Sequence, residues 1–146
     1  MKLNLGCGLD YREGWVNVDR RWPGLPAHVP MDMDVDLEGP WPWADGSAEA
    51  VLAYSVFEHV ADIMHVMAEA HRVLRAGGTI RIVGPSQTSA NWCADPTHKR
   101  AFNRQTFDCF DPATPLGKKA YNFYPKWRVL ERKDLGNDWL FVLEPR

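Results

Sequence analysis

The sequence predicts a single α/β domain with a mainly parallel sheet, and three observations support this prediction. Short apolar segments alternate with connecting segments along the chain, which is typical of parallel strands joined by crossovers. A length of 146 residues matches one ordinary domain. Hydrophobic residues make up 45% and charged residues 25% of the chain, as in globular proteins. We therefore treat residues 1–146 as one domain.

Four apolar segments in the first half of the chain are predicted strands. They cover residues 2–5, 15–18, 31–35 and 50–54. Irregular crossovers are expected over residues 20–30 and 38–47. Prolines in both crossovers remove backbone donors and fix φ, so a regular helix is not expected in either.

The clearest predicted helix covers residues 62–75, where apolar residues recur at helical spacing. Gly77-Gly78 is expected to end it, because glycine readily adopts the left-handed conformation common at helix C-termini. A fifth strand is predicted over residues 79–83, stopped by Gly84-Pro85.

The last part of the chain contains one insertion and two predicted strands. Residues 85–122 are polar and contain prolines, and only a short helix after Asn103 is expected there. Residues 126–131 and 139–143 flank a turn at Gly136-Asn137 and are predicted to be antiparallel neighbours.

Composition and charge exclude several classes of protein. A formal net charge of -2 lacks the basic excess that phosphate contacts require, so we expect no nucleic-acid partner. The three cysteines, Cys7, Cys93 and Cys109, show no paired spacing, which fits a reducing cytoplasm better than a disulfide framework or a zinc cluster. We find neither a signal peptide nor an apolar stretch of membrane-spanning length, so we expect a cytoplasmic protein without membrane contact.

The candidate site lies at the ends of the first three predicted strands. The first strand ends in Gly6-Cys7-Gly8, where backbone N–H groups can approach a ligand because glycine lacks a Cβ. Asp19 ends the second strand, where its carboxylate can accept the hydroxyl hydrogens of a ribose, and Asp36 ends the third, where it can receive the amino group of an adenine. Either aspartate alone is common in a turn, but the succession indicates a nucleoside site.

These residues, with several later stretches, resemble the class I S-adenosylmethionine-dependent methyltransferases, in particular their small bacterial and phage-like branch of methyltransferase type 11. The matching stretches are residues 3–8, 14–19, 36–37, 41–47, 50–52, 56–60 and 69–78. The resemblance covers residues 2–84. Asp95-Pro96-Thr97-His98, with Phe102, looks like an insertion that recurs in the same relatives.

The resemblance implies a Rossmann-like fold, with a seven-stranded sheet whose last strand is antiparallel, in a minimal version without N-terminal helices. It also implies S-adenosylmethionine as the cofactor and S-adenosylhomocysteine as the product. The residues implied to bind the cofactor are Asn4, Gly6, Cys7, Gly8, Asp19, Arg20, Asp36, Leu37, Tyr54, Ser55 and Glu58.

The resemblance also implies how the cofactor is oriented. Gly6 and Gly8 would lie against its methionine part, and Tyr54 and Ser55 would flank its sulfonium. Asn4 stands where many relatives have an acid, so the methionine end is expected to be held differently here.

Methyl transfer to a neutral oxygen or nitrogen benefits from a base, and histidine exchanges a proton near neutral pH. His98 is the first candidate because it lies in the insertion expected to border the substrate, and His59 is the second because it follows the fourth strand. For both, a structural hydrogen bond is the alternative. Glu58-His59 is similar to the E-x-x-E-H motif of metal-binding methyltransferases, but Ser55 replaces the first acid, so we expect no metal.

The insertion over residues 85–122 is the segment left to cover the cofactor. Its aromatic residues could fold over the pocket while its basic residues face an acidic acceptor or solvent, and a mobile surface loop is the alternative. These residues are Trp92, Phe102, Phe107 and Phe110, and Lys99, Arg100 and Arg104. A second subunit could supply the cover instead, so a homodimer stays open.

Two other functions stay open at this stage. An NAD-dependent oxidoreductase shares the glycine loop, but Tyr11 stands at its third glycine position and Asp19 follows sooner than the usual ~20 residues. A protein that binds S-adenosylmethionine or S-adenosylhomocysteine without catalysis is the other alternative. The fold does not specify a methyl acceptor, for which a small molecule or a glycan is our expectation.

Overall fold

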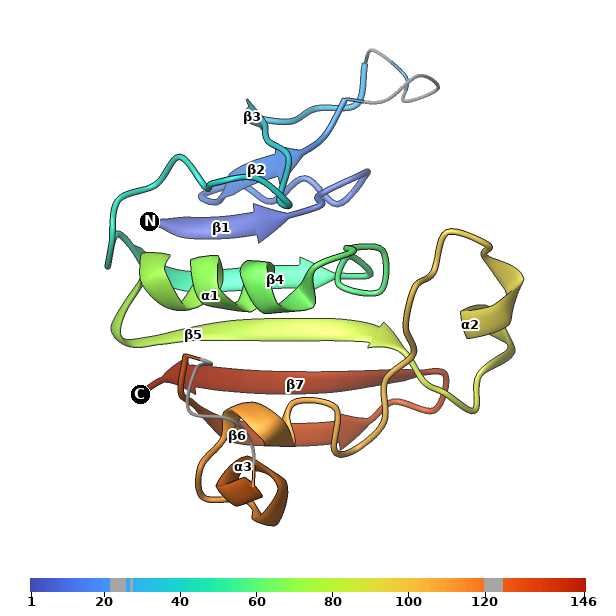
Figure 1. Ribbon diagram of the computed structural model, residues 1–146. Helices are drawn as coiled ribbons and strands as arrows, with labels where there is room; N and C mark the ends of the chain where they lie inside the picture. Colours follow the sequence, from blue (N-terminus) through green and yellow to red (C-terminus); the bar gives the residue numbers. More distant parts are fainter. Residues whose placement is uncertain (22–25, 27, 120–124) are drawn as a thin grey trace.

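A seven-stranded sheet with the order β3-β2-β1-β4-β5-β7-β6 forms the body of the computed structural model, which describes residues 1–21, 26, 28–119 and 125–146 (Figure 1). The strands are β1 Lys2–Leu5, β2 Val16–Asp19, β3 Met33–Asp34, β4 Ala48–Tyr54, β5 Leu74–Pro85, β6 Trp127–Asp134 and β7 Asp138–Pro145. Strands β1 to β5 pair in parallel, whereas β7 runs antiparallel to both β5 and β6. The α/β, Rossmann-like fold with an antiparallel last strand is thus confirmed.

The helix α1, Ile63–Val73, lies in front of β4 and beside β5 in Figure 1. It begins after Asp62, whose carboxylate accepts the backbone N–H groups of Met64 and His65 at 3.0 Å each. Its buried face contributes Val66, Met67, Ala70 and Val73 to the core. The apolar spacing therefore predicted the helix correctly, with small differences at its ends.

Gly77 and Gly78 do not end this helix, contrary to the expectation. The chain is extended from Leu74 onward, where β5 begins, and the two glycines lie inside that strand. Leu74 pairs with Ala48, but the next pair joins Thr79 to Ala50, so the intervening residues are accommodated as an irregularity in the register. A Cβ on Gly78 would come within 3.1 Å of the carbonyl oxygen of Glu49, which explains glycine at this close approach of two backbones.

Strand boundaries differ from the predictions where pairing, rather than local composition, sets them. The strand β3 has only two residues, because only Met33 and Asp34 pair with β2. The strands β6 and β7 form the expected antiparallel hairpin, and both are longer than predicted because their pairing continues almost to the turn at Gly136.

The described part of the insertion contains three short helical segments. They are α2 Ala90–Ala94, the 3-10 helix Asp108–Phe110 and α3 Pro115–Lys119. The short helix expected after Asn103 is a run of turns that leads into the 3-10 helix. Residues 120–122 of the insertion lie outside the described residues, as do residues 22–25 and 27 of the crossover predicted over residues 20–30.

Three of the four aromatic residues expected to fold over the pocket are buried in the core instead. Phe102, Phe107 and Phe110 are at most 4% exposed and belong to the core. The rings of Phe107 and Phe141 pack edge to face with centroids 4.9 Å apart. Burying apolar rings against the sheet removes more surface from water than an exposed lid would, and this decides their position. Trp92 alone among the four stays partly exposed.

Within the described part of the chain, we find no helix that is both long and apolar enough to cross a membrane.

Candidate functional site

A cleft of about 590 Å³ opens at the carboxyl ends of the first four strands, and its volume is in the range of small-molecule sites. Each strand contributes the residues that directly follow it, as expected for an edge where parallel strands end. The lining residues are Gly6, Gly8, Asp19, Arg20, Val35, Asp36, Leu37, Glu38, Ser55, Val56, His59, Val60 and Thr97.

Seven of the eleven residues expected to bind the cofactor line this cleft, together with the candidate base His59. The seven are Gly6, Gly8, Asp19, Arg20, Asp36, Leu37 and Ser55. The sequence analysis missed the other lining residues, which are Val35, Glu38, Val56, Val60 and Thr97. Each of these five stands next to a residue that it did select, so proximity in sequence was the available signal.

Asn4, Cys7 and Tyr54 do not line the cleft. The amide of Asn4 is 1% exposed and donates to the carbonyl oxygen of Asp10 and to Asn17, so it is a structural residue. Cys7 is 3% exposed, and burial, followed by the charge of Asp19, raises the pKa of its thiol to about 11. A neutral, buried thiol is a poor nucleophile. The side chain of Tyr54 is largely exposed outside the cleft.

The glycine loop has a backbone that only glycine adopts without strain. Gly6 and Gly8 have φ angles of 59° and 48°, in the left-handed region. A Cβ on Gly6 would also collide with the side chain of Val56, whereas a Cβ on Gly8 would meet no atom within 4 Å. The loop thus packs on Val56 at one glycine and leaves open space at the other.

The carboxylate of Asp19 is held rigidly at the end of β2. Its Oδ2 accepts the backbone N–H of Gly8 at 2.7 Å, and its Oδ1 accepts the backbone N–H of Arg20 at 2.7 Å. Each oxygen retains acceptor capacity because a carboxylate has about four lone-pair sites. The group can therefore accept hydroxyl hydrogens in the cleft while remaining fixed to the loop.

Asp36 lies on the rim of the cleft and joins the ends of two strands. Its carboxylate forms an ion pair with Arg20 at 3.1 Å and accepts the backbone N–H of Glu38 at 3.0 Å. Both charged side chains are about half exposed or more, so this ion pair adds little stability and can rearrange around a ligand.

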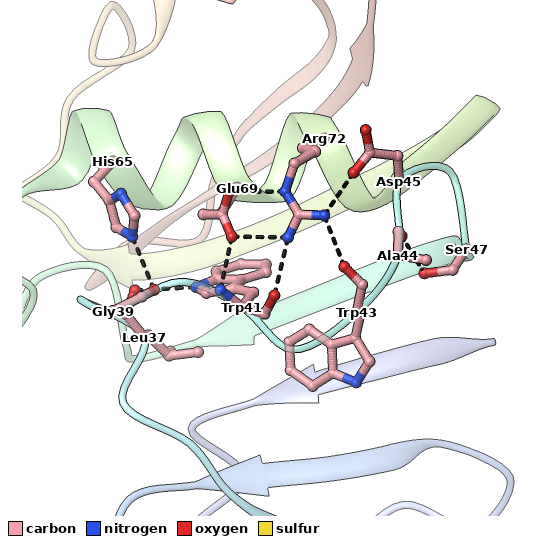
Figure 2. Close-up of polar contacts among 10 residues, drawn as sticks. All are labelled: Leu37, Gly39, Trp41, Trp43, Ala44, Asp45, Ser47, His65, Glu69 and Arg72. Carbon is pink, nitrogen blue, oxygen red and sulfur yellow. Dashed lines mark hydrogen bonds and ion pairs between the residues drawn. The ribbon is translucent and has the colours of Figure 1, made fainter.

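Glu69 and Arg72 on α1 hold the loop that follows Asp36 and Leu37 by hydrogen bonds (Figure 2). The guanidinium of Arg72 donates to the carbonyl oxygens of Trp41 and Trp43 at 3.0 and 2.7 Å. Glu69 accepts from Arg72 and from the backbone N–H of Trp41. The indole N–H of Trp41 in turn donates to the carbonyl oxygen of Leu37 at 3.0 Å, so the rim of the cleft is anchored to the helix.

Ser55 turns the chain sharply after β4. Its φ of 54° makes it the only residue other than glycine with a positive φ in the described part of the chain. Its backbone N–H donates to the carbonyl oxygen of Val83 at 2.9 Å, which holds this conformation. Such strain concentrates at functional sites, and here it places Ser55 on the wall of the cleft.

Glu58, His59 and His98 form a compact polar cluster beside the cleft, with one N or O atom of each within 4.8 Å of the others. The rings of His59 and His98 contact each other with centroids 4.7 Å apart. Glu58 is 1% exposed and, contrary to the expectation, does not line the cleft. Burial raises the pKa of its carboxyl to about 7. Burial, and then the neighbouring His98, lowers the pKa of His59.

Residues 95–100 are docked against the segment after β4. The hydroxyl of Thr97 donates to Asp95 at 2.7 Å, and its oxygen lies 2.9 Å from Nδ1 of His59. The guanidinium of Arg100 donates to the carbonyl oxygens of Phe57, Val60 and Ala61 instead of facing an acceptor. This part of the insertion therefore brings His98 to His59.

Comparison with known proteins adds independent findings. Residues 3–82 match a family model described as "Methyltransferase domain". No match is found among curated proteins.

Solved structures share the fold of this chain at low sequence identity. A SAM dependent methyltransferase from Archaeoglobus fulgidus superposes with a TM-score of 0.68 at 15% identity, covering 98% of this chain and 85% of that chain. A SAM dependent methyltransferase from Aquifex aeolicus superposes with a TM-score of 0.68 at 12% identity, covering 99% of this chain and 81% of that chain. The [4+2]-cyclase SpnF superposes with a TM-score of 0.69 at 12% identity, covering 99% of this chain and 73% of that chain.

Proposed function

This chain belongs to the methyltransferase domain family, and from that premise we propose that it transfers a methyl group to an oxygen or nitrogen atom of a small-molecule or glycan acceptor. It is an S-adenosylmethionine-dependent enzyme. The observation that carries the proposal is the cleft itself, where the glycine loop and the carboxylates of Asp19 and Asp36 meet at one edge of the sheet.

The residues present fit S-adenosylmethionine. The cleft is lined by the carboxylates of Asp19, Asp36 and Glu38 against a single cationic side chain, Arg20, which suits a ligand with a positive sulfur and an ammonium group. The open space at Gly8 leaves room for a ligand against the backbone. When bound, the cofactor supplies a methyl group already activated by its positive sulfur.

We assign the parts of the cofactor to this cleft as follows. Asp19 accepts hydrogens from the ribose hydroxyls, and Asp36 with the backbone beside Leu37 receives the adenine. Gly6 and Gly8 lie against the methionine part, and Ser55 stands near the sulfur. The apolar side chains that line the cleft exclude water and so favour methyl transfer over competing hydrolysis. They include Val35, Val56 and Val60.

The acceptor loses its proton at the cluster of Glu58, His59 and His98. We assign His59 as the proton-accepting group in the ion-free protein, ahead of His98, because His59 lines the cleft and His98 stands next to it. Thr97 orients the ring of His59 through Nδ1 and leaves Nε2 available. Aligning the acceptor and excluding water are then the remaining tasks of the chain.

An NAD-dependent oxidoreductase is not supported by the loop after β1. In that fold, the glycine loop opens a helix whose N-terminus holds the pyrophosphate. Residues 6–15, all of which the structure describes, form turns and contain no helix.

We further propose a cytoplasmic protein that pairs with a second copy of itself. The cysteines are free, as a reducing compartment requires. Leu9 and Tyr11, which follow β1, and Tyr54, the last residue of β4, are 85%, 47% and 51% exposed, and we infer that a second copy covers them. Sedimentation at several concentrations tests the pairing, and a monomer throughout would refute it.

Two measurements test the proposed function. Calorimetry should show binding of S-adenosylmethionine and S-adenosylhomocysteine and much weaker binding of NAD. Incubation with methyl-labelled S-adenosylmethionine and panels of hydroxyl and amino acceptors, including sugars, should transfer label to one class. Tight cofactor binding with no transfer to any class would instead identify a protein that binds the cofactor without catalysis.

A further inference from the structure

We propose that Glu58, His59 and His98 bind one divalent transition-metal ion, such as Zn²⁺, beside the cofactor cleft. The three side chains bring one N or O atom each within 4.8 Å of the others, close enough for a shared ion. The sequence analysis expected no metal because Ser55 replaces one acid of the E-x-x-E-H motif. The fold brings in His98 from the insertion as a further candidate ligand, and no spacing within the motif reveals this.

The carboxylate of Glu58 points to a cation by its own environment. The residue is 1% exposed, and its Oε2 has no hydrogen-bond partner. A buried polar atom without a partner is costly, and such an atom calls for a water, an ion or a ligand as its partner. A bound cation would satisfy this oxygen.

Hydrogen bonds on the far side of both rings leave the metal-binding nitrogens free. Thr97 gives its hydroxyl hydrogen to Asp95 at 2.7 Å, so its oxygen can only accept from Nδ1 of His59, 2.9 Å away. Nδ1 of His98 lies 3.2 Å from the carbonyl oxygen of Trp92, which likewise can only accept. Both neutral rings therefore carry their hydrogen on Nδ1 and present a lone pair at Nε2, as metal-binding histidines do.

The donor set and its surroundings select the kind of ion. Two imidazole nitrogens and one carboxylate oxygen favour Zn²⁺ and its transition-metal neighbours over Mg²⁺ or Ca²⁺, which prefer oxygen ligands. Asp95, whose Oδ2 lies 3.8 Å from Nε2 of His98, adds negative charge. Three protein ligands would leave a coordination position for a further oxygen, and His59 lines the cleft in which an acceptor would bind.

Metal binding itself goes beyond the proposed function. A role of the metal ion in catalysis, by contrast, rests on the proposed function. An acceptor hydroxyl on a divalent ion loses its proton to solvent at a lower pH than a free hydroxyl does. The ion would thereby supply the oxygen nucleophile that methyl transfer requires.

The test measures Zn²⁺ binding to chelator-treated protein without cofactor or acceptor, by competition with a chromophoric chelator and by elemental analysis. We expect one Zn²⁺ per chain. Each of Glu58→Gln, His59→Gln and His98→Gln should weaken binding at least about tenfold, and Thr97→Val should weaken it by about tenfold through the lost outer hydrogen bond. His28→Gln, which changes an exposed histidine outside the cluster, is the matched control and should bind Zn²⁺ like the unaltered protein.

Circular dichroism and S-adenosylhomocysteine binding establish that each variant is folded. His98, with a side chain 11% exposed, is the safest substitution if Glu58→Gln does not fold. Absence of bound Zn²⁺, or equal Zn²⁺ affinity in His98→Gln and the unaltered protein, would overturn the proposal. Because the measurement contains neither cofactor nor acceptor, its result is independent of whether methyl transfer is observed.

Discussion

The backbone N–H of Gly8 donates a hydrogen bond of 2.7 Å to Oδ2 of Asp19, so the glycine loop after β1 and the end of β2 form one unit. The second carboxylate oxygen accepts the backbone N–H of Arg20. A side chain fixed in this way loses little conformational freedom when a ligand binds. The position of the carboxylate that we assign to the ribose is therefore set by the fold before a cofactor binds.

Replacing Asp19 by alanine should weaken the binding of S-adenosylmethionine and of S-adenosylhomocysteine by about 1–3 kcal/mol, because the ribose hydroxyls lose their acceptor. Isothermal calorimetry measures both affinities. Glu13→Ala removes an exposed carboxylate that does not line the cleft and should leave them unchanged. Unaltered affinity in Asp19→Ala would remove this residue from the site.

Alanine at the two loop glycines should separate backbone strain from packing. Gly8→Ala should cost about 1–2 kcal/mol of unfolding free energy, since only its positive φ is strained. Gly6→Ala should cost more, because its Cβ also collides with Val56. In a Val56→Ala background, the cost of Gly6→Ala should fall to that of Gly8→Ala within about 0.5 kcal/mol. An unchanged cost in that background would show that the collision is relieved elsewhere.

The histidine cluster should affect turnover rather than cofactor affinity. His59→Gln and His98→Gln should each lower kcat roughly 10²-fold while S-adenosylhomocysteine binds almost as before. His71→Gln is a suitable control, since that ring lies on α1 and contacts the carbonyl oxygen of Lys126. Loss of cofactor affinity with retained turnover would instead assign these histidines to cofactor binding.

The Glu69–Arg72 pair should make stability depend on pH in the acid range. Hydrogen bonds from Arg72 lower the pKa of Glu69 from 4.5 to about 2. A lowered folded-state pKa stabilises the protein above the unfolded value, and this contribution is lost as pH falls from about 4.5 to about 2.

Glu69→Gln should therefore lower the unfolding free energy at pH 7 by roughly 1–3 kcal/mol, with the difference shrinking across that window in denaturant titrations. Glu49→Gln removes an exposed partner of Arg75 and should change stability by less than about 1 kcal/mol. A Glu69→Gln difference that persists undiminished at the acid end would mean that the carboxylate charge contributes nothing.

Phe102→Ala should destabilise the protein by about 3–5 kcal/mol, because this ring is fully buried in the core. Trp92→Ala, at a partly exposed ring of the same insertion, should cost much less.

Hydrogen exchange should be slow across residues 102–110 with and without S-adenosylhomocysteine. Across residues 95–99, exchange should become slow only when the ligand is bound. Fast exchange over 102–110 in the free protein would contradict the buried position of this segment.

The sequence by itself determined the sheet and the edge of the sheet at which the cleft lies. Strands, helix and glycine loop are set by local patterns, and parallel strands place their carboxyl ends at one edge whatever the loops do. Gly6, Gly8, Asp19, Asp36 and Leu37 were therefore predicted for the cleft and are found there. Asn4 does not line the cleft, because its amide donates hydrogen bonds to Asp10 and Asn17 inside the protein.

Only the tertiary structure decided what surrounds that edge. Phe102 of the insertion is buried in the core rather than over the pocket, because the sheet offers an apolar surface that no local pattern records. It carries His98 to Glu58 and His59, residues far apart in sequence, through hydrogen bonds of Thr97 and Arg100. Contacts of this kind depend on which groups compete for burial and for hydrogen-bond partners once the chain is folded, and that competition has no signature at any fixed spacing.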